Sequence, residues 1–486
     1  MDLTNSRVLV FGAGKSGIGA AGLLLRASAA EVILYDGNEQ LDRVALAEKV
    51  AETSQNMKTS LRESQAADHL EVILGELPAE VIRGLNLVIL SPGVPTDLPL
   101  VNALRESGVR IWGEVELAWE CGQGDVLAVT GTNGKTTTTS LLGEIMENYV
   151  QWLRERAEEN TSGAETGKDN VYVVGNIGNP YTDVADQMTE KTITVAEISS
   201  FQLETIEGFA PKVSAILNIT PDHLNRHHTM EEYIRVKERI TENQGKTDTC
   251  VLNYEDEILR EFGKTLKTKV IFFSSLHTLE KGLYLKENQI CYNDGKTETV
   301  ICSTDELNIL GRHNHENVMA AAGMAIAYGV PIEVIRDTAC AFKAVEHRIE
   351  YVTEKKGVVY YNDSKGTNPD AAIKGIQAMN RPTLLIGGGY DKNSSYEEWI
   401  QAFEGKVKYL VLIGQTREKI AEAAKNCGFE ACVLKDSLQE AVAFCAENAV
   451  SGDAVLLSPA CASWGMFPNY EERGRQFKEL VNQLDG

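Results

Sequence analysis

The sequence has no long apolar run. No stretch of about 18 consecutive apolar residues occurs, so the chain offers no candidate transmembrane helix. The first residues, MDLTNSR, lack the pattern of a secretory signal peptide. The nine cysteines are odd in number and form no C-x-x-C pair, which favours reduced thiols over a disulfide framework. These absences predict a cytoplasmic protein without a membrane partner.

Positive charge is also scarce. The chain has 47 lysines and arginines against 70 aspartates and glutamates, and its formal net charge is −23. This balance argues against a nucleic-acid backbone as a partner. Anionic substrates must therefore be held by local positive groups. The apolar fraction of 43% is ordinary for a globular protein, and the length favours about three domains.

Glycine spacing near the beginning of the chain is typical of a dinucleotide-binding turn. Residues 7–25, RVLVFGAGKSGIGAAGLLL, indicate a strand, a G-x-G-x-x-G turn and a helix. Asp36 ends the next apolar run, at the spacing that such a site requires. A further buried strand at 85–95 continues into a Ser-Pro-Gly turn. We expect a Rossmann-like domain whose loop binds a diphosphate, with Asp36 near the nucleoside.

A second phosphate-binding pattern, TGTNGKTT, occupies residues 130–137 between a strand and a helix. Backbone amides at the start of the helix suit phosphate groups. Lys135 can reach the β- and γ-phosphates of ATP, and the Thr136 hydroxyl can hold Mg²⁺. The loop is shorter than the usual pattern, because Val129 stands where the first glycine is expected and the glycine follows at Gly131.

Acidic and imidazole side chains end two apolar runs after this loop. Glu197 lies in the run 193–200, and Asp222 and His223 follow the run 213–220. The carboxyl ends of parallel strands lie beside helix N-termini, where ligands collect. Carboxylate oxygen suits Mg²⁺, whereas imidazole is a less usual ligand for it. Each residue alone fits a polar strand end, but beside a G-K-T loop they indicate a metal site.

A lysine shares the apolar stripe of a predicted helix at 231–240. Tyr233, Val236 and Ile240 line this stripe, and Lys237 lies one turn after Tyr233. Lysine is rarely buried without a partner. The pattern alone favours a lysine whose stem is buried and whose ammonium reaches water, while its place near the metal candidates points to a site.

The apolar runs group into three successive α/β units. Short polar strands are expected at about 268–310 and a helix at 312–330, before a last unit with four apolar runs. The polar segment 51–68 is expected to be exposed between a helix and a strand, and the charged segment 154–170 is expected to be a solvated loop. We predict an α/β fold with three domains: a Rossmann-like domain at 1–113, a central P-loop-type ATPase domain at 114–345 and a C-terminal Rossmann-like domain at 346–486.

Nine motifs follow one another along nearly the whole chain. They are TGTNGKTT, NIGNP (176–180), EISSFQLE (197–204), NITPDHL (218–224), YIRVKERI (233–240), GRHNHENVMAA (311–321), HR (347–348), NDSKGTNPD (362–370) and LLSPACASWGMFPNYEERG (456–474). Together they resemble the Mur ligase family, the ATP-dependent amide ligases of peptidoglycan precursor synthesis. SPGVP, GGGYDK and the final motif are similar to the branch that adds D-glutamate, and no DNPR-type motif of the diaminoacid branch is present.

The resemblance implies ATP and one or two Mg²⁺ ions as cofactors. It also implies that Lys237 is carbamylated, which turns a buried cation into an anionic oxygen ligand. The implied catalytic residues are Lys135, His223 and Lys237, and the implied metal ligands are Thr136, Glu197, His223 and Lys237. The implied ATP-binding residues are Gly131, Thr132, Asn133, Gly134, Lys135, Thr136, Thr137, Asn176, Asn314, Asn317, Arg348 and Asp363.

The resemblance also implies the two other substrates, UDP-N-acetylmuramoyl-L-alanine and D-glutamate, and a monomer is expected. The implied UDP-substrate residues are Gly14, Lys15, Ser16, Asp36, Ser91, Pro92, Gly93, Asn176 and Ser199. The implied D-glutamate residues are Lys365, Thr367, Lys392, Ser463 and Tyr470. Without the resemblance, Lys392 fits an ordinary exposed loop lysine.

The family chemistry runs through an acyl phosphate, because phosphorylation gives a carboxylate the leaving group that it lacks. Two alternatives are weighed against it. A folylpolyglutamate synthetase shares the middle and last domains, but residues 1–110 argue against it because that enzyme lacks the first domain. An NAD-dependent dehydrogenase would explain the first glycine loop and leave the second without a function; it predicts hydride transfer.

Overall fold

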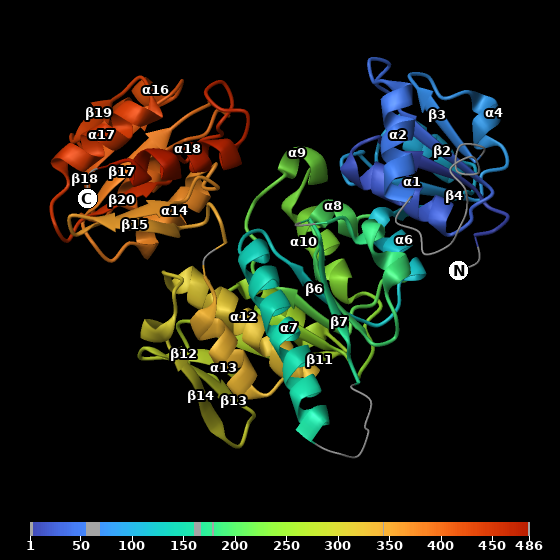
Figure 1. Ribbon diagram of the computed structural model, residues 1–486, viewed down its shortest axis with the longest axis horizontal. Helices are drawn as coiled ribbons and strands as arrows, with labels where there is room; N and C mark the ends of the chain where they lie inside the picture. Colours follow the sequence, from blue (N-terminus) through green and yellow to red (C-terminus); the bar gives the residue numbers. More distant parts are fainter. Residues whose placement is uncertain (1–2, 55–68, 160–166, 177–178, 344, 485–486) are drawn as a thin grey trace. The chain divides into compact units, whose positions relative to one another are not determined.

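The computed structural model describes residues 3–54, 69–159, 167–176, 179–343 and 345–484. Its strands form three sheets (Figure 1). By packing, the chain divides into two compact units. The first consists of Met1–Lys286, Cys291–Ile301 and Asn317–Thr338, and the second consists of Glu287–Ile290, Cys302–Glu316 and Ala339–Gly486.

The first sheet is parallel throughout and has the strand order β3-β2-β1-β4-β5. Its elements are β1 (Arg7–Phe11), α1 (Lys15–Arg26), β2 (Glu31–Asp36), α2 (Arg43–Ser54), β3 (Leu70–Leu74), α4 (Ala79–Ile82), β4 (Leu87–Leu90), α5 (Pro99–Glu106) and β5 (Arg110–Gly113). The order reverses between β1 and β4, which is the place where doubly wound sheets bind ligands.

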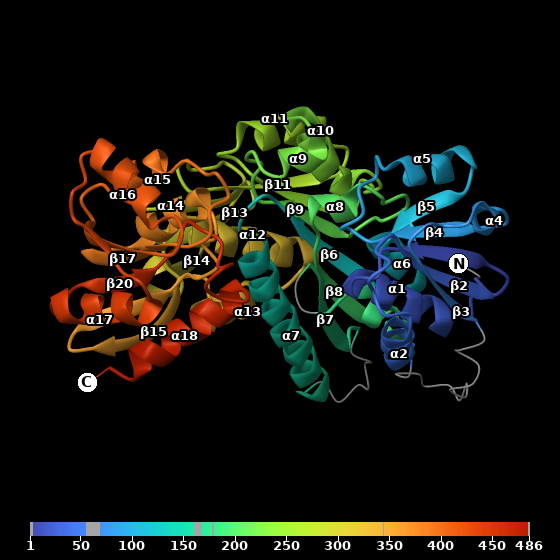
Figure 2. The same cartoon turned by 90° about the horizontal axis from the view of Figure 1, so that it is seen from above.

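Both faces of this sheet are covered, which explains why its strands are continuous apolar runs. Val8 and Val10 of β1 point into the cluster that includes Leu23 of α1. Leu9, between them, points into the opposite cluster, with Leu104 of α5. Figure 2 shows α1 and α2 on one side of the sheet and α4 and α5 on the other. The carboxyl edge of the strands is left for the loops.

The second sheet has nine strands in the order β14-β13-β12-β11-β10-β9-β6-β8-β7. Its strands are β6 (Asp125–Thr130), β7 (Asn170–Gly175), β8 (Thr192–Glu197), β9 (Val213–Ile216), β10 (Thr249–Asn253), β11 (Lys269–Ser274), β12 (Gly282–Lys286), β13 (Gln289–Asn293) and β14 (Glu298–Ser303). Pairing is parallel from β7 across to β12. The short strands at 268–310 that the sequence predicts are confirmed as β11 to β14.

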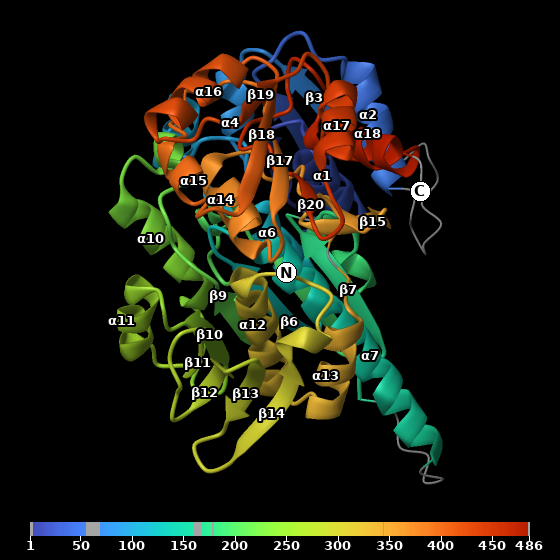
Figure 3. The same cartoon turned by 90° about the vertical axis from the view of Figure 1, so that its left-hand side faces the viewer.

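Helices around this sheet carry most of the motifs. They are α6 (Glu114–Cys121), α7 (Lys135–Glu159), α8 (Ser200–Leu203), α9 (Leu224–His227), α10 (Met230–Glu238), α11 (Glu257–Thr265), α12 (Arg312–Tyr328) and α13 (Ile332–Ala341). The long helix α7 runs beside β7 in Figures 1 and 3 and begins at the second glycine loop. The predicted helix at 312–330 is confirmed as α12.

The third sheet has the order β15-β16-β20-β17-β18-β19 and is parallel except for the edge pair β15 and β16. Its elements are β15 (Glu350–Lys355), β16 (Val358–Asn362), α14 (Pro369–Ala378), β17 (Thr383–Gly388), α15 (Glu397–Gln401), β18 (Val407–Ile413), α16 (Arg417–Asn426), β19 (Cys432–Leu434), α17 (Leu438–Asn448), β20 (Ala454–Leu457) and α18 (Tyr470–Asn482). Figure 3 shows α14 to α16 on one side of the sheet and α17 and α18 on the other.

Two sequence predictions about polar segments are wrong in part. The segment 154–170 is not a loop at its beginning, because α7 continues to Glu159, and β7 begins within it at Asn170. The segment 51–68 begins inside α2, where Ser54 is buried. Charged residues on a long helix face water and give a polar pattern that resembles a loop. Residues 55–68 and 160–166 lie outside the described part of the chain.

Candidate functional site

The first glycine loop lies where the first sheet reverses its order. Gly12 has φ +103°, and a Cβ on Gly17 would lie 1.8 Å from the Gly12 carbonyl oxygen. Ser91, directly after β4, donates its hydroxyl to the same carbonyl oxygen at 3.0 Å. Glycine is required at both positions, because a side chain would separate the loop from the helix.

The predicted UDP-substrate residues of this sheet share its carboxyl edge. Gly14, Lys15 and Ser16 form the start of α1, where Gly14 has no side-chain cap. Asp36, at the end of β2, accepts hydrogen bonds from the Ala13 amide at 2.9 Å and from a second amide after the strand. The carboxylate therefore fixes the glycine turn. Pro92 and Gly93 follow Ser91 in the loop after β4.

The second glycine loop joins β6 to α7 in a conformation that requires glycine. Gly131 has φ +150° and Gly134 has φ +86°, and a Cβ on Gly134 would lie 2.3 Å from Oδ1 of Asn317. Asn218, after β9, accepts from the Asn133 amide at 2.8 Å and donates to its carbonyl at 3.1 Å. Asn218 is a site residue that the sequence analysis missed, although it lies in the NITPDHL motif.

Two lysines meet at one carbonyl of this loop. Lys135 donates to the carbonyl oxygen of Gly131 at 2.8 Å and to that of Thr132 at 2.9 Å. Lys237 of α10 donates to the same Gly131 oxygen at 2.9 Å. Two ammonium groups at one oxygen repel each other, so this arrangement favours a lysine that has lost its positive charge.

Lys237 is buried, as its place on the apolar stripe predicts, and 1% of its surface is exposed. Burial, and secondarily the charge of Lys135, holds the pKa of Lys237 well below its usual range, against the opposing charge of Asp222. Its ammonium lies 4.8 Å from the ring centroid of Tyr233, whose hydroxyl is 3.0 Å from that of Thr132. The alternative of a lysine that reaches water is therefore wrong.

Glu197 ends β8 and is 1% exposed. Its Oε1 accepts a hydrogen bond from the side-chain amide of Asn176 at 2.7 Å. Its Oε2 is buried and has no hydrogen-bond partner among the described residues. An unpartnered buried carboxylate oxygen is costly, and a cation would satisfy it. Ile177 and Gly178 of the NIGNP motif lie outside the described residues.

His223 stands in a left-handed conformation, φ +52°, before α9. Its side chain is 51% exposed, and its Nε2 lies 3.4 Å from a carboxylate oxygen of Asp222. Its ring packs at 4.9 Å from that of Phe201, on the helix after Glu197. His223 therefore packs against α8, the helix that follows Glu197 in the chain. Ser199 caps that helix, α8, and makes a reciprocal capping box with Gln202.

A compact acidic and imidazole cluster occurs elsewhere in the described chain, at Glu346, His347 and Glu350. Lys478 donates to both carboxylates, at 2.5 and 2.9 Å. Both carboxylates of this cluster already have a cationic partner in Lys478, unlike the unpartnered oxygen of Glu197.

The two predicted nucleotide-binding asparagines lie one turn apart on α12, and each is 6% exposed. Asn317 accepts from the Thr138 hydroxyl of α7 at 3.4 Å. Asn314 donates to the Leu310 carbonyl at 2.7 Å. The expected common helical face is confirmed, and Asn317 lies beside the glycine loop.

Asp363, after β16, is buried and accepts from the Ser458 hydroxyl at 2.6 Å. Burial raises the pKa of Asp363 to about 7, although the hydrogen bond and the nearby Arg348 act in the opposite direction. It also accepts from the Ile349 amide at 3.3 Å. Asp363 therefore fixes the segment that carries Arg348.

The predicted D-glutamate residues lie at the carboxyl edge of the third sheet, four of them on loops and Tyr470 at the start of α18. The ammonium of Lys365 is 3.7 Å from the ring centroid of Tyr470, and that of the exposed Lys392 is 5.2 Å from the ring of Trp464. Ser463 is 4% exposed. Thr367 is half-buried in the loop before α14.

Arg473 is a second residue that the sequence analysis missed. It is 1% exposed and donates to the hydroxyl of Ser364 at 2.9 Å and to its carbonyl at 2.8 Å. Burial lowers the pKa of Arg473 to about 10. It joins α18 to the loop that carries Lys365. Its position in the YEERG motif is the only sequence signal for this role.

Within the described residues, no helix is both long and apolar enough to cross a membrane. Two family models match the chain: the Mur ligase middle domain over residues 129–325, and the glutamate ligase domain of Mur ligases over residues 347–461.

Full-length relatives also match. The UDP-N-acetylmuramoylalanine–D-glutamate ligase of Lachnoclostridium phytofermentans is 54% identical over 100% of this chain and 99% of its own length. The enzyme of the same name from Clostridioides difficile is 43% identical over 100% of both chains.

Solved structures share the fold at low identity. MurF from Acinetobacter baumannii has a TM-score of 0.58 at 15% identity, covering 98% of this chain and 94% of that one. The UDP-N-acetylmuramate-alanine ligase MurC from Thermotoga maritima has a TM-score of 0.56 at 18% identity, covering 98% of this chain and 99% of that one. The predicted α/β fold is confirmed.

Proposed function

The chain belongs to the Mur ligase family, and we propose that it is an ATP-dependent ligase that joins D-glutamate to UDP-N-acetylmuramoyl-L-alanine in peptidoglycan precursor synthesis. The convergence of Lys135 and the buried Lys237 on one carbonyl of the glycine loop carries the proposal. An NAD-dependent dehydrogenase would leave the second glycine loop, at residues 130–137, without a function. The first sheet, at residues 7–113, disfavours a folylpolyglutamate synthetase.

The reaction proceeds in two steps. The L-alanyl carboxylate attacks the γ-phosphorus of ATP, the bond to ADP breaks, and an acyl phosphate forms. The amine of D-glutamate then attacks the acyl carbon, phosphate leaves with the bonding electrons, and the amine loses a proton. Lys135 and the loop amides offset the repulsion between the two anions of the first step. Closed domains would keep water from the acyl phosphate.

Four residues would hold Mg²⁺: Thr136, Glu197, His223 and Lys237. The fit rests on the buried Glu197 oxygen without a hydrogen-bond partner in the described chain. A bound Mg²⁺ neutralises phosphate charge. The amine of Lys237 would add CO₂ and release a proton to give a carbamate. Its burial and lowered pKa favour the neutral amine that this addition needs.

Lys237→Ala tests the carbamate. Turnover should fall at least about 100-fold, because the anionic oxygen ligand is lost. Added short-chain carboxylates, such as acetate, should restore part of it. An alanine variant that is fully active without added carboxylate would exclude the carbamate. Lys264→Ala, an exposed lysine that pairs with Glu261, is the control and should stay active.

The ligase activity is tested by phosphate release from ATP with UDP-N-acetylmuramoyl-L-alanine and a panel of amino acids. Phosphate release should require both that substrate and D-glutamate. The absorbance of added NADH should not change, because no hydride is transferred. Release with L-alanine or a diaminoacid, and not with D-glutamate, would move the chain to another branch of the family.

We assign the D-glutamate site to Lys365, Thr367, Lys392, Ser463 and Tyr470. Lys392 is exposed and supplies a positive charge for a dicarboxylic amino acid. Lys392→Ala should raise the KM for D-glutamate at least about tenfold, and the KM for ATP should stay within about twofold. Equal KM values for D-glutamate in the variant and the wild type would exclude Lys392 from this site.

The remaining assignments complete the proposal. The ATP residues are those of 131–137 with Asn176, Asn314, Asn317, Arg348 and Asp363. The UDP-substrate residues are Gly14, Lys15, Ser16, Asp36, Ser91, Pro92, Gly93, Asn176 and Ser199. Each of the three sheets falls within one of the proposed domains 1–113, 114–345 and 346–486. We further propose that the protein acts as a cytoplasmic monomer.

A further inference from the structure

The loop after β4 is held by a residue far away in the sequence. The Val94 amide donates to the Ser91 carbonyl at 2.9 Å and closes a turn over the predicted UDP-substrate residues. The Val94 carbonyl accepts from Nη2 of Arg226 at 2.9 Å. Arg226 belongs to α9, 132 positions later in the chain. One guanidinium therefore joins the first sheet to the second within the first compact unit.

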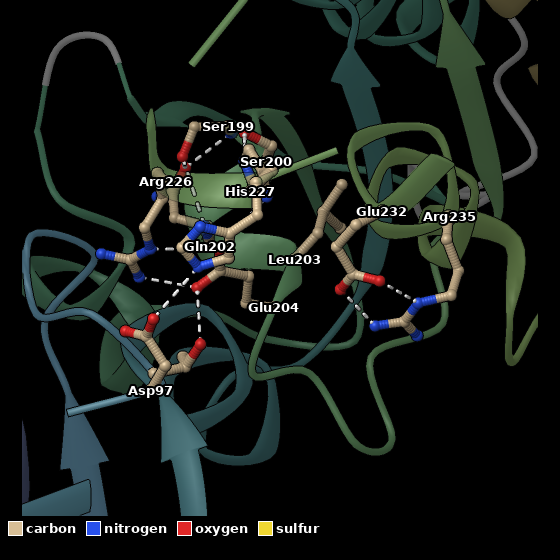
Figure 4. Close-up of polar contacts among 12 residues, drawn as sticks. Asp97, Ser199, Ser200, Gln202, Leu203, Glu204, Arg226, His227, Glu232 and Arg235 are labelled. Carbon is tan, nitrogen blue, oxygen red and sulfur yellow. Dashed lines mark hydrogen bonds and ion pairs between the residues drawn. The ribbon is translucent and has the colours of Figure 1, made fainter. Parts of the chain in front are cut away.

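Arg226 is itself fixed by Glu204, directly after α8. Its Nη2 donates to Oε2 of Glu204 at 2.6 Å, and its Nε donates to Oε1 at 3.3 Å. The two side chains are only 12% and 9% exposed, in that order. Thr96 also donates its hydroxyl to Oε2, at 3.3 Å. Figure 4 shows the guanidinium of Arg226 directed toward the carboxylate of Glu204. A paired, two-pronged guanidinium has little freedom to move.

The Arg226 guanidinium also lies near His223, one of the predicted metal ligands. Arg226 is three residues after His223, and its guanidinium lies 5.0 Å from the ring centroid of Phe201. The ring of His223 lies 4.9 Å from the same phenyl ring, and that of His227 lies 5.5 Å from it. Phe201 is thus a common support for Arg226 and His223.

Arg226 differs in its contacts from two other arginines nearby. A cavity of about 520 Å³ is lined by Arg105, Arg226 and Arg235, among others. Arg235 pairs with Glu232 on its own helix at 2.7 Å, and its side chain is 62% exposed. Arg105 donates to Asn102 on its own helix and, at 3.3 Å, to the Thr96 carbonyl in the loop after β4, all within the first sheet's part of the chain. Arg226 hydrogen-bonds both to the loop after β4 and to Glu204 after α8, and Arg235 offers a matched control.

We propose that Arg226 is a positioning residue. Glu204 holds its guanidinium, and the guanidinium in turn holds the loop after β4 at a fixed distance from α9. We infer that this distance lets the bound UDP-substrate reach the predicted metal ligand His223. The inference rests on the proposed function. The substrate must reach from the first glycine loop to the transferred phosphate, and a displacement of about 1 Å costs about 100-fold in rate. The hydrogen bond from Arg226 to the Val94 carbonyl supports that separation, together with the hydrogen bond from Thr96 to Glu204.

The experiment compares Arg226→Met, Arg226→Lys and the control Arg235→Met. Arg226→Met should raise the KM for UDP-N-acetylmuramoyl-L-alanine at least about tenfold and lower kcat, with the KM for ATP within about twofold. Arg226→Lys should fall between Arg226→Met and the wild type, because an ammonium cannot reproduce the fork. Arg235→Met should keep wild-type constants.

A merely structural role predicts something different. It predicts a lower Tm for Arg226→Met with unchanged kcat and KM per folded molecule, and that result would overturn the inference. If Arg226→Met does not fold, the double variant Arg226→Met with Glu204→Gln carries the test, since it leaves no buried carboxylate unpaired.

Calorimetry of UDP-N-acetylmuramoyl-L-alanine binding separates this inference from the proposed function. A wild type that binds this substrate without turnover would refute the function alone. The Kd should then rise at least about tenfold in Arg226→Met and should not change in Arg235→Met. A wild type that does not bind the substrate would overturn both.

Discussion

Burial changes the chemistry of individual charged side chains in this molecule. Lys237 and Glu197 are both 1% exposed, although their residue types normally lie on the surface. A buried amine favours its neutral form, and a buried carboxylate oxygen without a hydrogen bond is satisfied by a cation. Lys237 is favoured without its positive charge, whereas Glu197 is favoured beside a positive charge. A metal ion held by a Lys237 carbamate and by Glu197 would satisfy both residues. The same physics acts on Glu114, away from the predicted metal ligands.

Glu114→Gln tests this effect through stability. Burial raises the pKa of Glu114 to about 7, against a hydrogen bond from Gln202. The folded state therefore binds a proton that the unfolded state has lost. The free energy of unfolding should fall as pH rises from about 4.5 to about 7. Glutamine has no charge to bury, so at pH 8 the variant should gain up to about 3 kcal/mol, measured by urea unfolding.

The control for this prediction is Glu106→Gln on α5, whose side chain is exposed. It should leave the pH dependence unchanged. Parallel pH profiles for Glu114→Gln and the wild type would show that the Glu114 carboxyl is ionised in the folded protein.

At the scale of elements, short helices place the reacting groups. The helix α10 carries Lys237 and spans only Met230–Glu238. Helices of this length are marginal by themselves and depend on caps and tertiary contacts. Thr229 supplies the cap by accepting from the Glu232 amide at 3.2 Å. Tyr233 and Val236 supply the buried face.

Thr229→Ala should cost about 1 kcal/mol of stability, because the cap is lost. Thr229→Ser should keep most of the stability, since serine offers the same oxygen. Urea unfolding measures both. Thr265→Ala, at the exposed end of α11, serves as the control and should be nearly neutral. Equal stability of Thr229→Ala and the wild type would show that α10 does not need this hydrogen bond.

At the scale of the whole molecule, ligands should stabilise the folded chain by mass action. Mg-ATP at about 100 times its Kd adds about 2.7 kcal/mol if it binds only the folded state. Thermal unfolding with and without Mg-ATP should show a higher Tm for the wild type. Lys135→Met should lose most of this shift. The shift produced by UDP-N-acetylmuramoyl-L-alanine should remain, because that ligand uses the first loop.

An undiminished Mg-ATP shift in Lys135→Met would place the nucleotide elsewhere. Loss of both shifts would indicate that the variant is misfolded. Arg43→Met, at the start of α2, is a control that should keep both.

The sequence predicted the helices and strands better than it predicted the contacts between residues that are distant in the chain. The strands at 7–11 and 125–130 and their glycine turns follow from local patterns. The strands β7 and β10 were not identified, because neither carries a motif and apolar runs of this length do not identify a strand by themselves. The end of α7 was misjudged because charged helix residues resemble a loop. Asn218 and Arg473 were missed because their partners lie far away in the sequence.

By itself, the sequence determined the two glycine turns, the apolar stripe around Lys237 and the order of the motifs, since these depend on local conformation and spacing. Only the tertiary structure decided which groups meet. Lys237 reaches Gly131 across 106 positions, and Arg226 reaches Val94 across 132. Such contacts depend on strand order and crossing connections. A parallel sheet brings together strand ends that are distant in the chain.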